Sequence, residues 1–159
     1  MTVPTPSQTV GPFFAVMLPW TDPAVLGGDR WLRGVLYDGK DEPVLEGMLE
    51  LWDPSTGAFG RCHTDASGAY AFRFAKPAAL PGPPVQAPHL AMSVFARGLL
   101  DRVVTRVYFP DEPAANAADP VLSAIPDLAV TLVARPGDDG YRFDIHLQGE
   151  HETVFFDLV

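Results

Sequence analysis

Residues 87–109 carry the pattern that most restricts the fold of this chain, because apolar and polar side chains alternate along two runs. Leu90, Met92 and Val94 alternate with Ala91, Ser93 and Phe95, and Val103, Thr105, Val107 and Phe109 alternate with Arg102, Val104, Arg106 and Tyr108. Such period-two patterning is typical of β-strands. Gly98, between the runs, can adopt the positive φ that a tight turn needs. The stretch predicts a hairpin that buries one face and leaves the other for chemistry or a partner.

The rest of the chain predicts an all-β fold in one domain spanning residues 1–159. Hydrophobic residues make up 47% and charged residues 19%, which argues against disorder, and the 17 prolines disfavour long helices. Further strands are expected at Leu32–Asp38, Val44–Trp52, Arg61–Thr64, Ala69–Ala75, Ala129–Ala134, Tyr141–Gln148 and Thr153–Leu158. Lys76–Pro88 is predicted to be a surface loop, and Pro110–Pro126 to hold at most one helical turn. Eight or nine short strands between turns favour a β-sandwich or barrel.

Charge and cysteine content restrict the partners and the compartment. The formal net charge of -9 argues against binding to nucleic acid or to an anionic membrane. It does not exclude a small anionic substrate held by one or two arginines, for which Arg97 and Arg106 are available. The single cysteine, Cys62, excludes an internal disulfide, and the sequence shows neither a membrane-spanning run nor a signal peptide. We therefore expect a cytoplasmic protein.

The histidines do not form a recognisable metal motif. His63, His89, His146 and His151 lack the spacing of metal-binding pairs, and Cys62 has no C-x-x-C partner. His89 stands at the entrance of the predicted hairpin, whereas the others are expected at the surface. Residues 1–20, with Pro6 and Pro12, form a stiff arm that we expect to be docked rather than frayed.

Several ordered motifs resemble one enzyme family. The segments TPSQTVGPFF, LWDPSTGAFG, APHLAMSVFARG, TRVYF and YRFDIHLQGEHETVFFD occur between residues 5 and 157. Together they are similar to the intradiol ring-cleavage dioxygenases, and within them to the alpha-type chains of two-chain enzymes that act on protocatechuate. The resemblance implies a β-sandwich of the intradiol dioxygenase type, in agreement with the strand pattern.

The resemblance also implies that this chain binds no metal. In the family, a catalytic beta chain holds non-haem Fe(III) with two tyrosines and two histidines. His89 matches the first histidine, but the second falls on Ala91, one tyrosine falls on Phe59, and the loop expected to hold the other tyrosine contains none. Alanine and phenylalanine have no donor atom, so Fe(III) is expected in a homologous partner beta chain.

The family places the substrate pocket between the two chains. By motif match, Thr9, Gly11, Pro12 and Phe13 of the N-terminal arm are expected at the pocket wall, and Arg97 is expected to assist the substrate carboxylate. The implied reaction is cleavage of protocatechuate by O2 to 3-carboxy-cis,cis-muconate, in an enzyme built from several alpha–beta pairs. None of the catalytic residues is expected in this chain.

Three alternatives remain open from the residues alone. Arg97 could form a purely structural ion pair at a strand end. The chain could be a binding or structural β-sandwich that has lost catalysis, or a self-sufficient enzyme whose ligands are rearranged among Tyr37, Tyr70, Tyr108, Tyr141 and two histidines.

Overall fold

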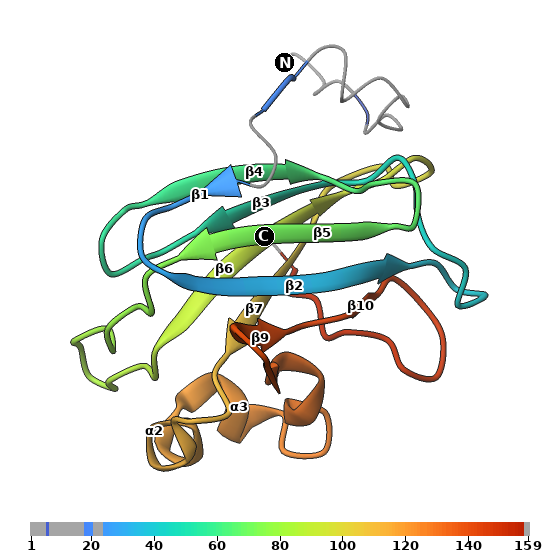
Figure 1. Ribbon diagram of the computed structural model, residues 1–159. Coiled ribbons are helices and arrows are strands. Elements are labelled where there is room, and N and C mark those ends of the chain that lie inside the picture. Colours follow the sequence, from blue (N-terminus) through green and yellow to red (C-terminus); the bar gives the residue numbers. More distant parts are fainter. Residues whose placement is uncertain (1–5, 7–17, 21–23, 158–159) are drawn as a thin grey trace, which may run out of the picture.

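The computed structural model describes residues 6, 18–20 and 24–157, which form two sheets packed face to face with short helices at one end (Figure 1). The strands are β1 Ala24–Val25, β2 Arg30–Tyr37, β3 Met48–Trp52, β4 Phe59–His63, β5 Ala69–Phe74, β6 His89–Phe95, β7 Val103–Tyr108, β8 Arg135–Gly137, β9 Gly140–Arg142 and β10 Ile145–His146. One sheet has the order β1-β5-β2-β9-β8, with β10 also pairing β2, and the other has the order β4-β3-β6-β7. The predicted all-β sandwich is confirmed.

The alternating residues predicted to be apolar fill the space between the sheets. Leu90, Met92 and Val94 of β6 are at most 1% exposed, and Tyr70, Phe72 and Phe74 of β5 are at most 3% exposed. These residues belong to a single core cluster that both sheets share. The predicted hairpin is also confirmed, since β6 pairs antiparallel with β7 and Gly98 between them has φ of +96°.

The prediction of at most one helical turn in residues 110–126 is wrong. Two helices occur there, α2 Pro113–Ala118 and α3 Pro120–Ala124, and each has a proline in its first turn. A proline at this position costs no hydrogen bond and fixes a helical φ. Asp119 caps α3 by accepting hydrogen bonds from the backbone of Val121 (2.9 Å) and Leu122 (3.2 Å). The prolines therefore start helices here instead of preventing them.

Three predicted strands are also corrected. Residues 129–132 form a 3-10 helix, η1 Ala129–Leu132, because a short apolar run does not by its pattern distinguish a strand from a helix. The run from Tyr141 is divided between β9 and β10, since the side chain of Asp144 accepts from the Val35 amide at 3.0 Å. Residues 153–157 lie beside β7 outside regular strand structure, with Phe156 donating to the carbonyl of Val104 at 2.8 Å.

The start of the predicted strand 44–52 is likewise wrong, because β3 begins only at Met48. Leu45, which the alternation placed with the buried Leu49 and Leu51, is 54% exposed. The residues before Met48 form a bend that crosses the end of the sandwich and contributes to a surface cavity.

A second, smaller core covers part of the outer face of the four-stranded sheet, the face directed away from the other sheet. It consists of Ala87, Tyr108, Leu122 and Leu132, with Val154 and Phe156 packed against it. Side chains of β3, β4, β6 and β7 form the remainder of the outer face. Among the described residues, no helix has the length and apolar character to cross a membrane.

Candidate functional site on the outer face of the four-stranded sheet

His89 is the first residue of β6 and is buried beneath the second core, where it is 2% exposed. Its Nδ1–H donates to the carbonyl of Ala87 at 2.8 Å, and its ring lies 5.4 Å from that of Tyr108, directly opposite on β7. Burial lowers the pKa of His89, and the positive charge of Arg106 lowers it further. The imidazole is therefore neutral near pH 7, with Nε2 as its lone-pair nitrogen.

A buried hydrogen-bond network fixes the surroundings of His89. The Tyr108 hydroxyl donates to Asp119 Oδ1 (3.1 Å), and the other oxygen of this fully buried carboxylate accepts from the Ala87 amide (2.8 Å). Burial raises the pKa of Tyr108 to about 12, while Arg106 opposes the rise, so the phenol stays protonated and can donate. The network joins the entrance of β6, the end of β7 and the start of α3.

The positions matched to missing metal ligands lie in one row across the sheet. Phe59 of β4 is opposite Trp52 of β3, which is opposite Ala91 of β6, and Ala91 is opposite Arg106 of β7. Neighbouring strands are about 4.8 Å apart, which places Phe59 about 10 Å from Ala91. Phe59 begins β4 rather than lying in the preceding turn. With no donor on Phe59 or Ala91, and a cation on Arg106, the residues of this row do not fit a metal ion.

The other described histidines have neighbours of their own. Across the described residues, no group of three or more His, Cys, Asp and Glu side chains is arranged to hold a metal ion. His63 Nε2 contacts the carbonyl of Leu18 at 2.9 Å, and His146 Nδ1 contacts Asp41 at 3.1 Å and stacks on Tyr37. His151 lies beside His146, and both line a cavity of about 550 Å³.

Exposed aromatic rings gather at the β4 side of the outer face, and we call Trp20, Trp52 and Phe59 the aromatic face. Their exposed fractions are 43%, 46% and 38%, which is high for side chains of this size. Trp20 packs edge-on against Phe59, and Arg61 lies over both rings. Arg61 is itself held by Glu50 through an Nε–Oε1 bond of 3.0 Å. The sequence analysis did not predict this surface. Trp20 and Trp52, two large apolar side chains in a strongly acidic chain, were the signal that could have indicated it.

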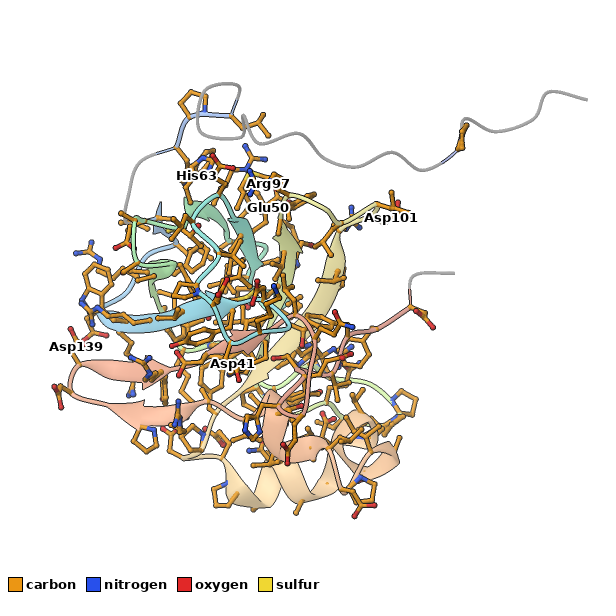
Figure 2. The ribbon with its side chains drawn as sticks, turned by 90° about the vertical axis from the view of Figure 1, so that its right-hand side faces the viewer. Asp41, Glu50, His63, Arg97, Asp101 and Asp139 are labelled. Carbon is orange, nitrogen blue, oxygen red and sulfur yellow. The ribbon has the colours of Figure 1, made fainter. Side chains whose placement is uncertain are left out.

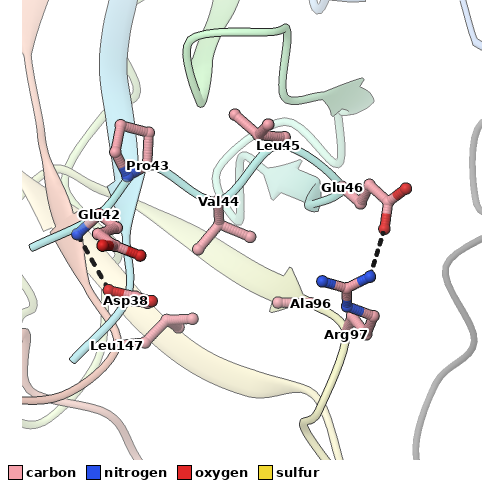
Figure 3. Close-up of a pocket in the computed structure, with 9 residues that line it drawn as sticks. All are labelled: Asp38, Glu42, Pro43, Val44, Leu45, Glu46, Ala96, Arg97 and Leu147. Carbon is pink, nitrogen blue, oxygen red and sulfur yellow. Dashed lines mark hydrogen bonds and ion pairs between the residues drawn. The ribbon is translucent and has the colours of Figure 1, made fainter. Parts of the chain in front are cut away.

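His89 begins β6, and Arg97 lies just beyond the other end of this strand. The two ends of β6 are about 20 Å apart. Its side chain is 71% exposed and pairs with Glu46 at 3.4 Å. The pair crosses the edge of a cavity of about 270 Å³ whose floor includes Val44, Ala96 and Leu147 (Figure 3). His63 is joined to this end by register, through Met48 and Phe95, and Figure 2 shows it close to Arg97. The structure therefore does not bring Arg97 together with His89.

Four of the five predicted substrate-binding residues cannot be compared with the structure. Thr9, Gly11, Pro12 and Phe13 lie outside the described residues, so the expectation that they reach a partner's pocket stays a prediction. The next described residues after them along the chain, Leu18, Pro19 and Trp20, approach β4 through Leu18 and Trp20. The end of the N-terminal arm therefore packs against β4 and supplies Trp20 to the aromatic face.

Comparison with known proteins identifies the family. The chain is 38% identical to the protocatechuate 3,4-dioxygenase alpha chain of Burkholderia cepacia, covering 97% of each chain, and 36% identical to that of Pseudomonas putida, covering 97% of this chain and 96% of the relative. It is 32% identical to the Burkholderia cepacia beta chain, over 80% of this chain and 68% of the relative. No family model matches the sequence.

The fold agrees with these relatives. The dioxygenase domain of a carbohydrate-binding fusion protein from Streptomyces sp. SirexAA-E superposes with a TM-score of 0.62 at 20% identity, covering 91% of this chain and 99% of that domain. The alignment with the Burkholderia alpha chain extends over 193 positions, which is more than the 159 residues present here. The Burkholderia chain therefore has segments that this chain lacks. The chain is a member of the intradiol dioxygenases and, within them, of the protocatechuate 3,4-dioxygenase alpha-chain family.

Proposed function

We propose that this chain is the non-iron-binding alpha subunit of a protocatechuate 3,4-dioxygenase, completing an active site whose Fe(III) is held by a homologous beta chain. The observation that carries the proposal is the row Phe59–Trp52–Ala91–Arg106, which contains two positions matched to iron ligands of the family, Phe59 and Ala91, and presents no metal ligand. The similarity to both alpha and beta chains supports a two-chain enzyme. The reaction would convert protocatechuate and O2 to 3-carboxy-cis,cis-muconate.

The aromatic face is the proposed docking surface for the beta chain. Trp20, Trp52 and Phe59 expose apolar area that an isolated soluble domain rarely leaves in water, and aromatic side chains dominate the centres of protein interfaces. Arg61, with its charge already neutralised by Glu50, can be covered at a lower desolvation cost than an unpaired arginine. The face is thus suited to a partner with a matching apolar surface.

The role proposed for this chain in the reaction is to complete the pocket and exclude water. The partner's Fe(III) would supply the Lewis acid that activates the catechol. Thr9, Gly11, Pro12 and Phe13 are proposed to form part of the pocket wall, with Gly11 allowing close approach and Pro12 fixing the backbone. Arg97 forms a long and exposed ion pair with Glu46 in this structure, which holds it only weakly. In the assembly, Arg97 is proposed to turn toward the substrate carboxylate.

Expression of the chain with and without the iron-ligating homologue tests the proposal. The expected result is that the chain alone retains no iron and consumes no O2 with protocatechuate, whereas the co-purified complex does both. A chain that by itself carries stoichiometric iron, with ligand-to-metal absorption, would instead establish the self-sufficient enzyme. A complex that forms but has no activity on any catechol would favour a structural role.

The same proposal includes a higher-order assembly of alpha–beta pairs and a cytoplasmic location. The exposed aromatic face supports association, and the single cysteine, Cys62, is consistent with a reducing compartment. Size-exclusion chromatography with light scattering on the co-purified complex measures the assembly. Fractionation of the native host tests the location.

A further inference from the structure

Arg106 is the last residue of the row Phe59–Trp52–Ala91–Arg106, and it lies near His89 on the outer face. Its Cα is directly opposite that of Ala91, the position of the missing second histidine, and it lies two residues from Tyr108, which is opposite His89. Opposite neighbours on one face of a strand pair lie about 5 Å apart, and diagonal neighbours lie about 7–8 Å apart, within reach of a long side chain. Arg106 is therefore the opposite neighbour of Ala91 and a diagonal neighbour of His89.

The guanidinium is directed along the face toward the His89 end. Arg106 Nη1 donates to Gln86 Oε1 at 2.9 Å and to the Tyr108 hydroxyl at 3.2 Å, and the group lies over the ring of Phe156. These contacts hold the side chain in a half-buried position. A guanidinium whose Nη1 binds two acceptors and which lies over a ring is restrained from swinging into solvent.

The charge of Arg106 is not neutralised by a direct partner. Among the residues that the structure describes, Arg106 forms no ion pair, and its acceptors are a neutral amide and a neutral phenol. Arg61, the other arginine of this face, is by contrast paired with Glu50.

We propose that the guanidinium of Arg106 takes the place of a metal cation on this face. Its positive charge would then prevent metal binding there in addition to the lack of ligands. The inference rests on the proposed function, in which this chain binds no iron. Its consequence is that restoring a ligand at position 91 does not restore a metal site while Arg106 is present. A half-buried like charge repels an incoming cation far more strongly than an exposed one.

Binding of Co²⁺ to the purified full-length chain tests this inference, by equilibrium dialysis and by visible absorption of the bound ion. Ala91→His places a second imidazole on the same face as His89, two residues along the strand. The double variant Ala91→His/Arg106→Gln is expected to bind Co²⁺ at least about tenfold more tightly than Ala91→His alone. Ala91→His/Arg106→Lys, which keeps the charge, is expected to bind as weakly as the single variant.

Matched controls separate charge from other effects. Ala91→His/Arg61→Gln removes an arginine of the same face whose charge is already paired, and is expected to leave Co²⁺ affinity at the level of Ala91→His. Near-ultraviolet circular dichroism and thermal unfolding verify that each variant is folded. Should Arg106→Gln variants unfold, Ala91→His/Arg106→Met, which keeps the length of the aliphatic stem, takes their place in the comparison.

The outcomes distinguish this inference from the proposed function. Equal Co²⁺ affinities for Ala91→His with and without Arg106, including no binding by either, overturn the role of the arginine and leave the proposed function intact. A wild-type chain that binds Co²⁺ at the His89 face and consumes O2 with a catechol overturns the proposed function itself.

Discussion

The carboxylate of Asp119 and the amide of Ala87 are joined by a 2.8 Å hydrogen bond between residues 32 positions apart, both of them buried. The same carboxylate accepts from the Tyr108 hydroxyl and from the first turn of α3. One side chain therefore ties the loop before β6, the end of β7 and a helix together beneath His89. The positions of the groups around His89 therefore depend on this carboxylate.

Asp119→Ala is expected to lower the free energy of unfolding by about 2–4 kcal/mol, because it removes a helix cap and leaves buried donors without an acceptor. Chemical denaturation monitored by circular dichroism measures the loss. Asp138→Ala, at an exposed turn, is the matched removal of a carboxylate and should change stability by less than about 0.5 kcal/mol. Equal effects of the two substitutions would contradict the network.

Trp52→Ala is expected to weaken association with the beta chain by about 2 kcal/mol, or roughly thirtyfold in Kd, because this indole is the most exposed ring of the aromatic face. Titration calorimetry with the purified partner measures the change. Leu100→Ala, which removes an apolar side chain that is 60% exposed elsewhere, serves as the control and should leave Kd unchanged. An unchanged Kd for Trp52→Ala would remove the aromatic face from the interface.

Arg97→Ala in the assembled enzyme is expected to raise KM for protocatechuate roughly fivefold, equivalent to about 1 kcal/mol, with a smaller change in kcat. Adding Thr9→Ala should raise KM further, since that residue is proposed to line the same pocket. Glu46→Gln removes only the ion-pair partner of Arg97. If Glu46→Gln reproduces the kinetics of Arg97→Ala, or if the double variant behaves as wild type, the arginine has a structural role only.

The buried His89 is expected to make the free energy of unfolding depend on pH. Its pKa in the folded chain lies below the ordinary value of 6.5, so the unfolded chain binds more protons as pH falls through that value. Stability from this residue is therefore complete above pH 6.5 and is lost on acidification below it, with a slope of at most about 1.4 kcal/mol per pH unit. His89→Gln should flatten the unfolding free energy between pH 7.5 and about 5.5, whereas the exposed His151→Gln should not.

Local patterns determined the hairpin, the buried rows and the absence of metal ligands. Alternation along β6 and β7 specified which residues share a face, because side chains of a strand point to opposite sides in turn. The missing donors at Ala91 and Phe59 follow from side-chain chemistry alone. These properties depend on residues close together in the chain, and so they could be predicted from the sequence.

The tertiary structure decided what lies beside each of those residues. Arg106 faces Ala91 because of the strand register, and Tyr108 is covered because Asp119 and the helices pack on it. Arg97, although only eight residues from His89, is placed at the other end of the sheet because extended strands carry neighbours in sequence far apart in space. Register and long-range hydrogen bonds join segments whose pairing no local pattern specifies, so these relations came only with the fold.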